Sequence, residues 1–237
     1  MQIIGIIPAR YASSRFPGKP LIDIQGKSMI QRVYEQACKA QSLDDVIVAT
    51  DDERISEHVL SFGGKVMLTA SNHLTGTDRI IEVANQLNAT AFINIQGDEP
   101  FIQPEQIDKL ADYFKNRSNS QAEIATLIRP CNEMELINSA NSIKVSIKKN
   151  GEAMYFSRSV IPFNRNGADF KYWKHIGMYG YTKAALQQIS TFEAGFFEQI
   201  ESLEQLRWLE NGLAIQTIET DLETISIDVP EDLLRIK

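Results

Sequence analysis

The chain has 237 residues, of which 43% are hydrophobic and 23% are charged, and its formal net charge is −7. These values are typical of a soluble globular protein, and the length suits one large α/β domain. The acidic balance argues against nucleic-acid binding, which needs a broad basic face. Because no apolar run reaches membrane-spanning length and no signal sequence is evident, we expect a cytoplasmic protein without membrane insertion.

The number and spacing of the cysteines also favour the cytoplasm. The two cysteines, Cys38 and Cys131, are far apart in the sequence and form no CxxC pair. They give neither a disulfide framework nor a zinc motif, so we interpret them as core thiols in a reducing environment.

The first predicted strand begins at Ile3 and consists of branched apolar residues interrupted only by Gly5. A short β-branched run of this kind indicates a buried strand. We expect Pro8 to end the strand, because proline has no N–H to donate to a ladder.

The loop after this strand carries three cations, Arg10, Arg15 and Lys19, among small residues that include Ser13. Small residues allow backbone N–H groups to approach an anion, and clustered cations favour a polyphosphate ligand. The alternative is a solvated basic loop. We favour the anion site, because three cations lie beside a Pro-Gly-Lys-Pro turn. The loop is not a Walker A motif, because Pro20 follows the lysine, and the chain has no GxGxxG fingerprint, which disfavours a nicotinamide dehydrogenase.

The rest of the first half alternates between predicted strands and helices. Helices are expected from a cap at Ser28, from about Glu53 to Gly63, at 80–87 and from Pro104, and strands are expected at 46–50, 65–69 and 91–95. This alternation predicts an α/β fold with a doubly wound, mostly parallel sheet. In such sheets ligands bind beyond the carboxyl ends of the strands.

The second half has a different pattern. Strands are expected at 123–128, 142–148, 153–156, 174–182, 213–217 and 224–227, a helix at 201–211 and a terminal helix from Pro230. The turn at Gly151 predicts antiparallel pairing of its two flanking strands and hence a mixed sheet. We predict one domain over 1–237, with a parallel nucleotide-binding half at about 1–121. The remaining half, about 122–237, would add a small antiparallel subdomain that closes over the site or pairs with another subunit.

Two acids are candidate metal ligands. Asp98 follows the predicted strand at 91–95 and comes directly after Gly97, which permits a tight turn, and Asp228 closes the last predicted strand in a similar way. Carboxylates beside a triphosphate are suited to hold Mg²⁺. The alternatives are a turn-forming acid for Asp98 and a helix-entry acid for Asp228. Asp51 and Asp52 are interpreted as turn and helix-start residues. No Ser-His-Asp or Cys-His set is evident, so no covalent intermediate is expected.

The segment PARYASSRFPGKPL at 8–21 closely resembles the signature loop of the 3-deoxy-manno-octulosonate cytidylyltransferases, which make CMP-Kdo. The resemblance continues, in family order, in ATDD at 49–52, TGTDR at 75–79, NIQGDEP at 94–100, YFSRSVIP at 155–162, KHIGMYGY at 174–181, ESLEQLRWLENG at 201–212 and IDVPEDL at 227–233. Three departures are a short loop at 163–172, Ser226 in place of a glycine or similar small residue, and Val229 in place of the more frequent threonine.

This resemblance implies a Rossmann-like nucleotidyltransferase fold and the transfer of CMP from CTP to the anomeric hydroxyl of 3-deoxy-D-manno-octulosonate (Kdo). Pyrophosphate would leave, and CMP-Kdo would serve lipopolysaccharide synthesis. The implied CTP-binding residues are Arg10, Ser13, Arg15 and Lys19, and the implied catalytic residues are Asp98, Lys19 and Arg10. Mg²⁺ would be held by Asp98 and Asp228. The implied sugar site comprises Arg79, Gln96, His175, Tyr179, Glu204 and Gln205, and the family pattern suggests a homodimer.

Alternatives remain open at the level of both residues and function. Taken alone, Arg79 is a surface cation at a helix N-terminus, His175 a satisfied, partly buried histidine, and Tyr179 core packing. One alternative is a cytidylyltransferase for 8-amino-Kdo, because a single side chain can set the choice between a hydroxyl and an amine. A sialic-acid cytidylyltransferase is less favoured, because that branch has a differently composed first loop, without the Ser-Arg-Phe-Pro-Gly-Lys-Pro continuation. A non-catalytic nucleotide-binding sensor on the same fold is an alternative from another class.

Overall fold

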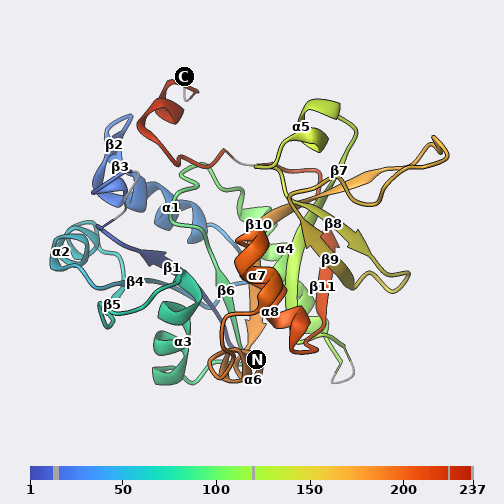
Figure 1. The fold of residues 1–237 in the computed structure, drawn as a ribbon. Coiled ribbons are helices and arrows are strands. Elements are labelled where there is room, and N and C mark those ends of the chain that lie inside the picture. The colour runs from blue at the N-terminus through green and yellow to red at the C-terminus, as the bar shows by residue number, and fades with distance from the viewer. Residues whose placement is uncertain (13–15, 119–120, 224, 236–237) are drawn as a thin grey trace. The chain divides into compact units, whose positions relative to one another are not determined.

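The computed structural model describes residues 1–12, 16–118, 121–223 and 225–235 (Figure 1). The chain divides into two compact units. Unit 1 comprises residues 1–115 together with 224–237, and unit 2 comprises residues 116–223. Unit 2 is therefore an insertion in the sequence of unit 1.

Unit 1 contains a parallel sheet in the order β6-β1-β4-β5. Its strands are β1 (Ile3–Ala9), β4 (Asp45–Thr50), β5 (Val66–Leu68) and β6 (Ala91–Asn94). From β1 the chain moves outward through β4 to β5 and then returns to the opposite side of β1 with β6. This reversal makes the sheet doubly wound, and it creates a crevice at the carboxyl ends of β1 and β6.

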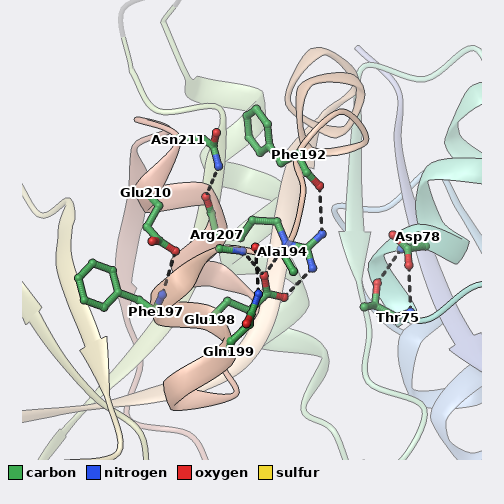
Figure 2. A network of polar contacts seen from close by, with 11 residues as sticks. Thr75, Asp78, Phe192, Ala194, Phe197, Glu198, Gln199, Arg207, Glu210 and Asn211 are labelled. Carbon is green, nitrogen blue, oxygen red and sulfur yellow. Dashed lines mark hydrogen bonds and ion pairs between the residues drawn. The ribbon is translucent and has the colours of Figure 1, made fainter.

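The helices of this unit are α1 (Met29–Ala37), α2 (Glu53–Ser61), α3 (Gly76–Gln86) and α4 (Pro104–Asn116), with short 3₁₀ turns η1 (Lys19–Leu21) and η2 (Pro230–Arg235) and a small hairpin of β2 (Asp23–Ile24) and β3 (Lys27–Ser28). Three of the α-helices, α1, α2 and α3, begin at residues whose side chains cap them. The Ser28 hydroxyl accepts from the Gln31 N–H at 3.2 Å, as the predicted cap requires. In α3, Thr75 and Asp78 form a reciprocal capping box (Figure 2).

The prediction that Pro8 ends the first strand is wrong, because β1 continues to Ala9 and Pro8 pairs with Ala49 of β4. The reason is the direction in which Pro8 faces. The carbonyl of Ile6 accepts from Ile95 N–H, so Ile6 and, two residues later, Pro8 face the β6 side. The pairing of β1 with β6 ends at Ile6, so no N–H is needed at Pro8.

Unit 2 contains a mixed sheet whose strands are β7 (Ile124–Cys131), β8 (Lys144–Ile147), β9 (Ala153–Ser157), β10 (Tyr172–Thr182) and β11 (Ile215–Glu219). Strand β11 lies parallel to β7, whereas β10 pairs antiparallel with both β7 and β8. The predicted antiparallel pairing around Gly151 is confirmed by β8 and β9. Together the two units confirm an α/β fold with a mostly parallel first half and antiparallel strands in the second.

The helices of unit 2 are α5 (Met134–Asn138), α6 (Lys183–Ile189), α7 (Phe196–Glu201) and α8 (Gln205–Glu210). The prediction of one helix over 201–211 is wrong, since the chain breaks at Ser202, whose φ is 52°. Glu198 of α7 binds Arg207 of α8 through two N–O contacts of 2.6 Å, and the two short helices are held together by this ion pair (Figure 2). The break between α7 and α8 therefore allows Glu198 and Arg207 to meet, whereas one continuous helix would hold these two residues apart.

The predicted strand at 224–227 is also wrong for its described part, since residues 225–227 lie in no strand. Thr224 lies outside the described residues. Ile227 instead makes one backbone hydrogen bond, from its N–H to the Asp98 carbonyl at 2.9 Å, and its side chain is buried with Ile24 and Met29. Burial of the Ile227 side chain thus fixes this segment in place of the strand pairing that the sequence predicted. Pro230 then begins η2, at the position predicted for the terminal helix.

None of the helices in the described ranges is long and apolar enough to cross a bilayer.

Candidate functional site

A cleft lies at the carboxyl ends of β1 and β6 in unit 1, where the reversal of strand order leaves a crevice. Its volume is about 270 Å³. Pockets that bury a whole drug-sized ligand hold roughly 300–1,000 Å³, so this cleft has room for part of a nucleotide-sized ligand. It is lined by Pro8, Ala9, Arg10, Lys19, Pro20, Gly76, Arg79, Gln96, Gly97, Asp98 and Asp228.

Gly97 allows the turn after β6 to approach the end of β1. A Cβ atom at this position would lie 2.8 Å from the Pro8 carbonyl oxygen, a distance that real Cβ contacts do not reach. Only glycine fits there without displacing the backbone. The next residue is Asp98, which lines the cleft beside Gly97.

Lys19 enters the same cleft from η1, which follows Gly18 in the left-handed conformation with φ of 72°. The Lys19 ammonium lies 2.9 Å from Asp98 Oδ2 and 3.9 Å from Asp228 Oδ1. It also donates to the Ile227 carbonyl at 3.0 Å. One cation therefore contacts both carboxylates that the sequence suggested as metal ligands.

Arg79 of α3 is fully buried at the wall of the cleft. Its NH2 lies 3.1 Å from Asp51 Oδ1, and its NH1 donates to the Thr69 hydroxyl. Burial lowers the pKa of the guanidinium, and the charge of Asp51 opposes that shift. Arg79 is thus no surface cation. The prediction of Asp51 as a turn residue missed this ion pair, and its only sequence signal was a carboxylate directly after β4.

The remaining predicted residues of this half differ in how they are held. Arg10 is exposed, and its NH1 donates to the Leu74 carbonyl at 3.2 Å. Gln96 lines the cleft next to Gly97. Ser13 and Arg15, predicted to bind phosphate, lie outside the described residues. The cleft of unit 1 therefore brings together six predicted residues: Arg10, Lys19, Arg79, Gln96, Asp98 and Asp228.

His175 and Tyr179, predicted to contact the sugar, lie on β10 within a buried aromatic cluster of unit 2. The His175 ring nitrogen Nε2 is 3.0 Å from the Thr126 hydroxyl. Burial lowers the pKa of His175 to about 3, so the imidazole is neutral at physiological pH. Burial also raises the pKa of the Tyr179 hydroxyl well above its usual value, so the phenol is protonated. The cluster comprises Phe156, His175, Tyr179, Tyr181 and Trp208.

Glu204 and Gln205, the other two predicted sugar residues, stand at the start of α8. Glu204 occupies the N-cap position, and its charge contributes to the raised pKa of Tyr179. Gln205 is buried, and its Nε2 finds no hydrogen-bond partner within the part of the chain that the structure describes. The same holds for the indole Nε1 of Trp208, which packs edge-on against the Tyr179 ring. A buried donor without a partner is costly, so Gln205 is not an ordinary residue of a solvated helix face.

The donor set of the cleft fits a hard divalent cation. Asp98 and Asp228 present carboxylate oxygens to a common position, which the Lys19 ammonium now contacts. Mg²⁺ is usually held by one or two carboxylates, the remaining ligands being phosphate and water. Among the described residues no group of three or more His, Cys, Asp or Glu side chains could hold a metal ion. The set therefore suits a cation that arrives with phosphate oxygens.

Comparison with known proteins gives a consistent result. Residues 4–221 match the model of a family described as cytidylyltransferase. A relative from Cytophaga hutchinsonii named 3-deoxy-manno-octulosonate cytidylyltransferase is 51% identical, covering 100% of this chain and 96% of its own. A solved CMP:2-keto-3-deoxy-manno-octonic acid synthetase complexed with CTP superimposes with a TM-score of 0.94 at 41% identity, covering 100% of this chain and 97% of its own. A cytidylyltransferase from Leptospira borgpetersenii, at 17% identity, covers 98% of this chain and 83% of its own with a TM-score of 0.63 and shares the fold.

Proposed function

The chain belongs to the cytidylyltransferase family, and we propose from this that it transfers CMP from CTP to the anomeric hydroxyl of Kdo. The observation that carries the proposal is the convergence of Arg10, Lys19, Asp98 and Asp228 on one cleft of unit 1. The full-length similarity to relatives named 3-deoxy-manno-octulosonate cytidylyltransferase supports the choice of sugar.

In the proposed reaction the anomeric oxygen forms a bond to the α-phosphorus while the bond from that phosphorus to the bridging oxygen breaks. Pyrophosphate leaves, and the hydroxyl proton passes to solvent. Arg10 and Lys19 neutralise the charge that develops on the leaving pyrophosphate, with Ser13 and Arg15 as further predicted contacts. Such transfers depend mainly on positioning and charge neutralisation, which these side chains supply.

Asp98 and Asp228 would hold Mg²⁺ in the same cleft. When bound, this ion supplies charge neutralisation and lowers the pKa of an oxygen that it contacts. The two carboxylates would hold it between the acid groups of the protein and the triphosphate, and its charge would keep these anions from repelling one another.

For the sugar, Arg79 is suited to bind the carboxylate, because its buried guanidinium retains an Nε without a hydrogen-bond partner among the described residues. Gln96 can bind a hydroxyl at the same cleft. The neutral His175, the protonated Tyr179, Glu204 and Gln205 supply further donors and acceptors, which matches a substrate with several hydroxyls. This assignment gives a role to the buried amide of Gln205, whose Nε2 has no hydrogen-bond partner among the described residues.

We also propose that the protein is a homodimer. Helix α7 buries none of its residues, and Phe196 and Ile200 are 67% and 65% exposed. An exposed apolar face on a short helix is typical of an interface. Light scattering of the parent protein and of the Phe196→Ser, Ile200→Ser variant tests this proposal. We expect the mass of a dimer for the parent and the mass of a monomer for the variant. A monomeric parent, or a variant that remains dimeric, would refute the proposed interface.

We further propose a cytoplasmic setting, with which the free thiols of Cys38 and Cys131 accord.

The decisive experiment is pyrophosphate release from CTP and Mg²⁺ with Kdo, 8-amino-Kdo or N-acetylneuraminate as the acceptor. Release with Kdo as the best acceptor supports the proposal, whereas a preference for either of the others identifies a cytidylyltransferase for that sugar. A folded protein that binds CTP but releases no pyrophosphate with any of the three would instead be the nucleotide sensor.

Asp98→Asn tests the residue that links metal and phosphate. We expect turnover to fall by at least about a thousandfold, because electrostatic stabilisation of the transferred group is lost. Asp169→Asn, which removes an exposed carboxylate from unit 2, is the matched control and should leave the rate unchanged. A near-normal rate in Asp98→Asn would remove Asp98 from the catalytic site.

A further inference from the structure

The ammonium of Lys19 takes the same oxygens that would hold the divalent cation. Its Nζ donates to Asp98 Oδ2 at 2.9 Å and to the Ile227 carbonyl at 3.0 Å, and it lies 3.9 Å from Asp228 Oδ1. These are hard oxygen donors, two of them charged, of the type that Mg²⁺ prefers. The Lys19 side chain is only 16% exposed, so it is held in the cleft and does not extend into solvent.

A lysine and a divalent cation cannot share this position. Two cations a few ångströms apart repel strongly in a partly buried site, where the effective dielectric constant is well below that of water. Binding of the metal to Asp98 and Asp228 therefore requires the ammonium to leave. The cost of that departure is lowest when another anion receives it, and the triphosphate of CTP is such an anion.

The surroundings allow the side chain to move while the oxygens stay fixed. Ile227 is fully buried, and its N–H donates to the Asp98 carbonyl, which ties the two carboxylate-bearing segments together. The backbone of Lys19 is likewise fixed by η1, where its N–H donates to the Phe16 carbonyl at 3.2 Å. The flexible part is the four-carbon stem of the lysine, which can swing without breaking backbone contacts.

We propose that Lys19 is the resident counter-ion of the Asp98–Asp228 pair and excludes the divalent cation until CTP withdraws its ammonium. The metal and CTP then bind with positive coupling, because each favours the same displaced position of Lys19. This inference rests on the proposed function, since it takes the two carboxylates as the metal site. It goes beyond that function in one respect: in the CTP-free protein, the ammonium of Lys19, a residue of the phosphate site, occupies the metal site.

The test measures the binding of Mn²⁺, a paramagnetic substitute for Mg²⁺, to CTP-free protein by electron paramagnetic resonance. Lys19→Gln removes the resident charge, and we expect its Mn²⁺ affinity to exceed that of the parent protein by at least about tenfold. Lys19→Arg keeps the charge and should remain weak. Lys65→Gln is the matched control, because Lys65 Nζ lies 2.7 Å from Asp45 in an exposed pair of the same unit, and it should leave Mn²⁺ affinity unchanged.

Asp98→Asn separates the failure of this inference from that of the proposed site. If Lys19→Gln and Lys19→Met bind Mn²⁺ no more tightly than the parent while Asp98→Asn still weakens binding, the counter-ion role is refuted and the metal site stands. If Asp98→Asn leaves Mn²⁺ affinity unchanged both alone and combined with Lys19→Gln, the proposed metal site fails and the counter-ion role fails with it. Circular dichroism of each variant confirms that the fold is retained.

Discussion

Arg79 and Asp51 form an ion pair in which the guanidinium is fully buried, the carboxylate is 22% exposed, and the nitrogen and oxygen are 3.1 Å apart. Arg79 belongs to α3, and Asp51 follows β4. A buried guanidinium without a counter-charge is costly to the fold, and Asp51 provides that counter-charge from the protein. Asp51 is therefore a positioning residue, which keeps a charged arginine at the wall of the cleft before any substrate arrives.

Asp51→Asn is expected to destabilise the fold by about 1–3 kcal/mol, because it leaves the buried charge of Arg79 without its partner. The KM for Kdo should rise more than that for CTP. Chemical denaturation and steady-state kinetics measure the two effects. Asp52→Asn is the control, because Asp52 caps α2 and pairs with the exposed Arg54, and asparagine keeps the cap. Equal effects of both changes would contradict the role given to Asp51.

Gln205→Met is expected to separate stability from sugar binding. The change removes a buried amide whose Nε2 lacks a partner among the described residues, so the melting temperature should stay constant or rise. The KM for Kdo should rise at least about tenfold, since a hydrogen bond to a substrate hydroxyl is lost. Gln187→Met, at an exposed position of α6, is the comparison and should change neither value. A lower melting temperature with an unchanged KM would indicate a structural role for Gln205.

His175 is expected to make the stability of the protein depend on pH. Its pKa is lowered to about 3 in the folded protein, whereas the unfolded chain titrates near the usual value of 6.5. Between these values the unfolded state binds the extra proton, so the free energy of unfolding falls as the pH decreases from 6.5. The slope from one such group is at most about 1.4 kcal/mol per pH unit.

Denaturant titrations of the parent protein and of His175→Gln between pH 7 and pH 4 measure this contribution. The slope should decrease in the variant, because its side chain does not titrate. His58→Gln should retain the His175 component. Identical slopes in the parent and in His175→Gln would mean that His175 takes up protons equally in both states.

Gly97→Ala is expected to disturb the cleft through the backbone. The added Cβ would lie 2.8 Å from the Pro8 carbonyl, so the turn that carries Asp98 must shift. We expect a loss of about 1–3 kcal/mol in stability and at least a tenfold lower kcat. Gly177→Ala is the matched control, because no atom of the described residues lies within 4 Å of its added Cβ. A normal kcat for Gly97→Ala would show that the close approach is not required for activity.

Local sequence patterns predicted the first half of the fold well. The β-branched runs of β1 and β4 and the cap at Ser28 depend on neighbouring residues, so they are readable from a single chain. Features that depend on distant partners were missed. Pro8 stays in its strand because β6 has ended beside it, and Ile227 avoids a strand because its side chain packs with Met29.

The candidate site shows the same division. Asp98 and Lys19 follow strand ends and lie in small-residue loops, and these local signals identified both as candidates. The partner of each was not predictable, since the Lys19 ammonium contacts a carbonyl 208 positions away. Burial likewise changes the character of Arg79 and His175, and their partners Asp51 and Thr126 lie far from them in the sequence. No periodicity in the sequence encodes those pairs.

The return of the chain to unit 1 after residue 223 has a consequence for synthesis on the ribosome. A nascent chain ending at residue 115 already contains the residues of β1, β4, β5 and β6, yet the segment that carries Ile227 and Asp228 follows more than a hundred residues later. Until it emerges, Asp98 lacks the backbone partner Ile227 N–H and Lys19 lacks two of its three oxygen contacts. The cleft is therefore completed late in translation, and a ribosome stalled within unit 2 carries a nucleotide-binding sheet without a finished catalytic centre.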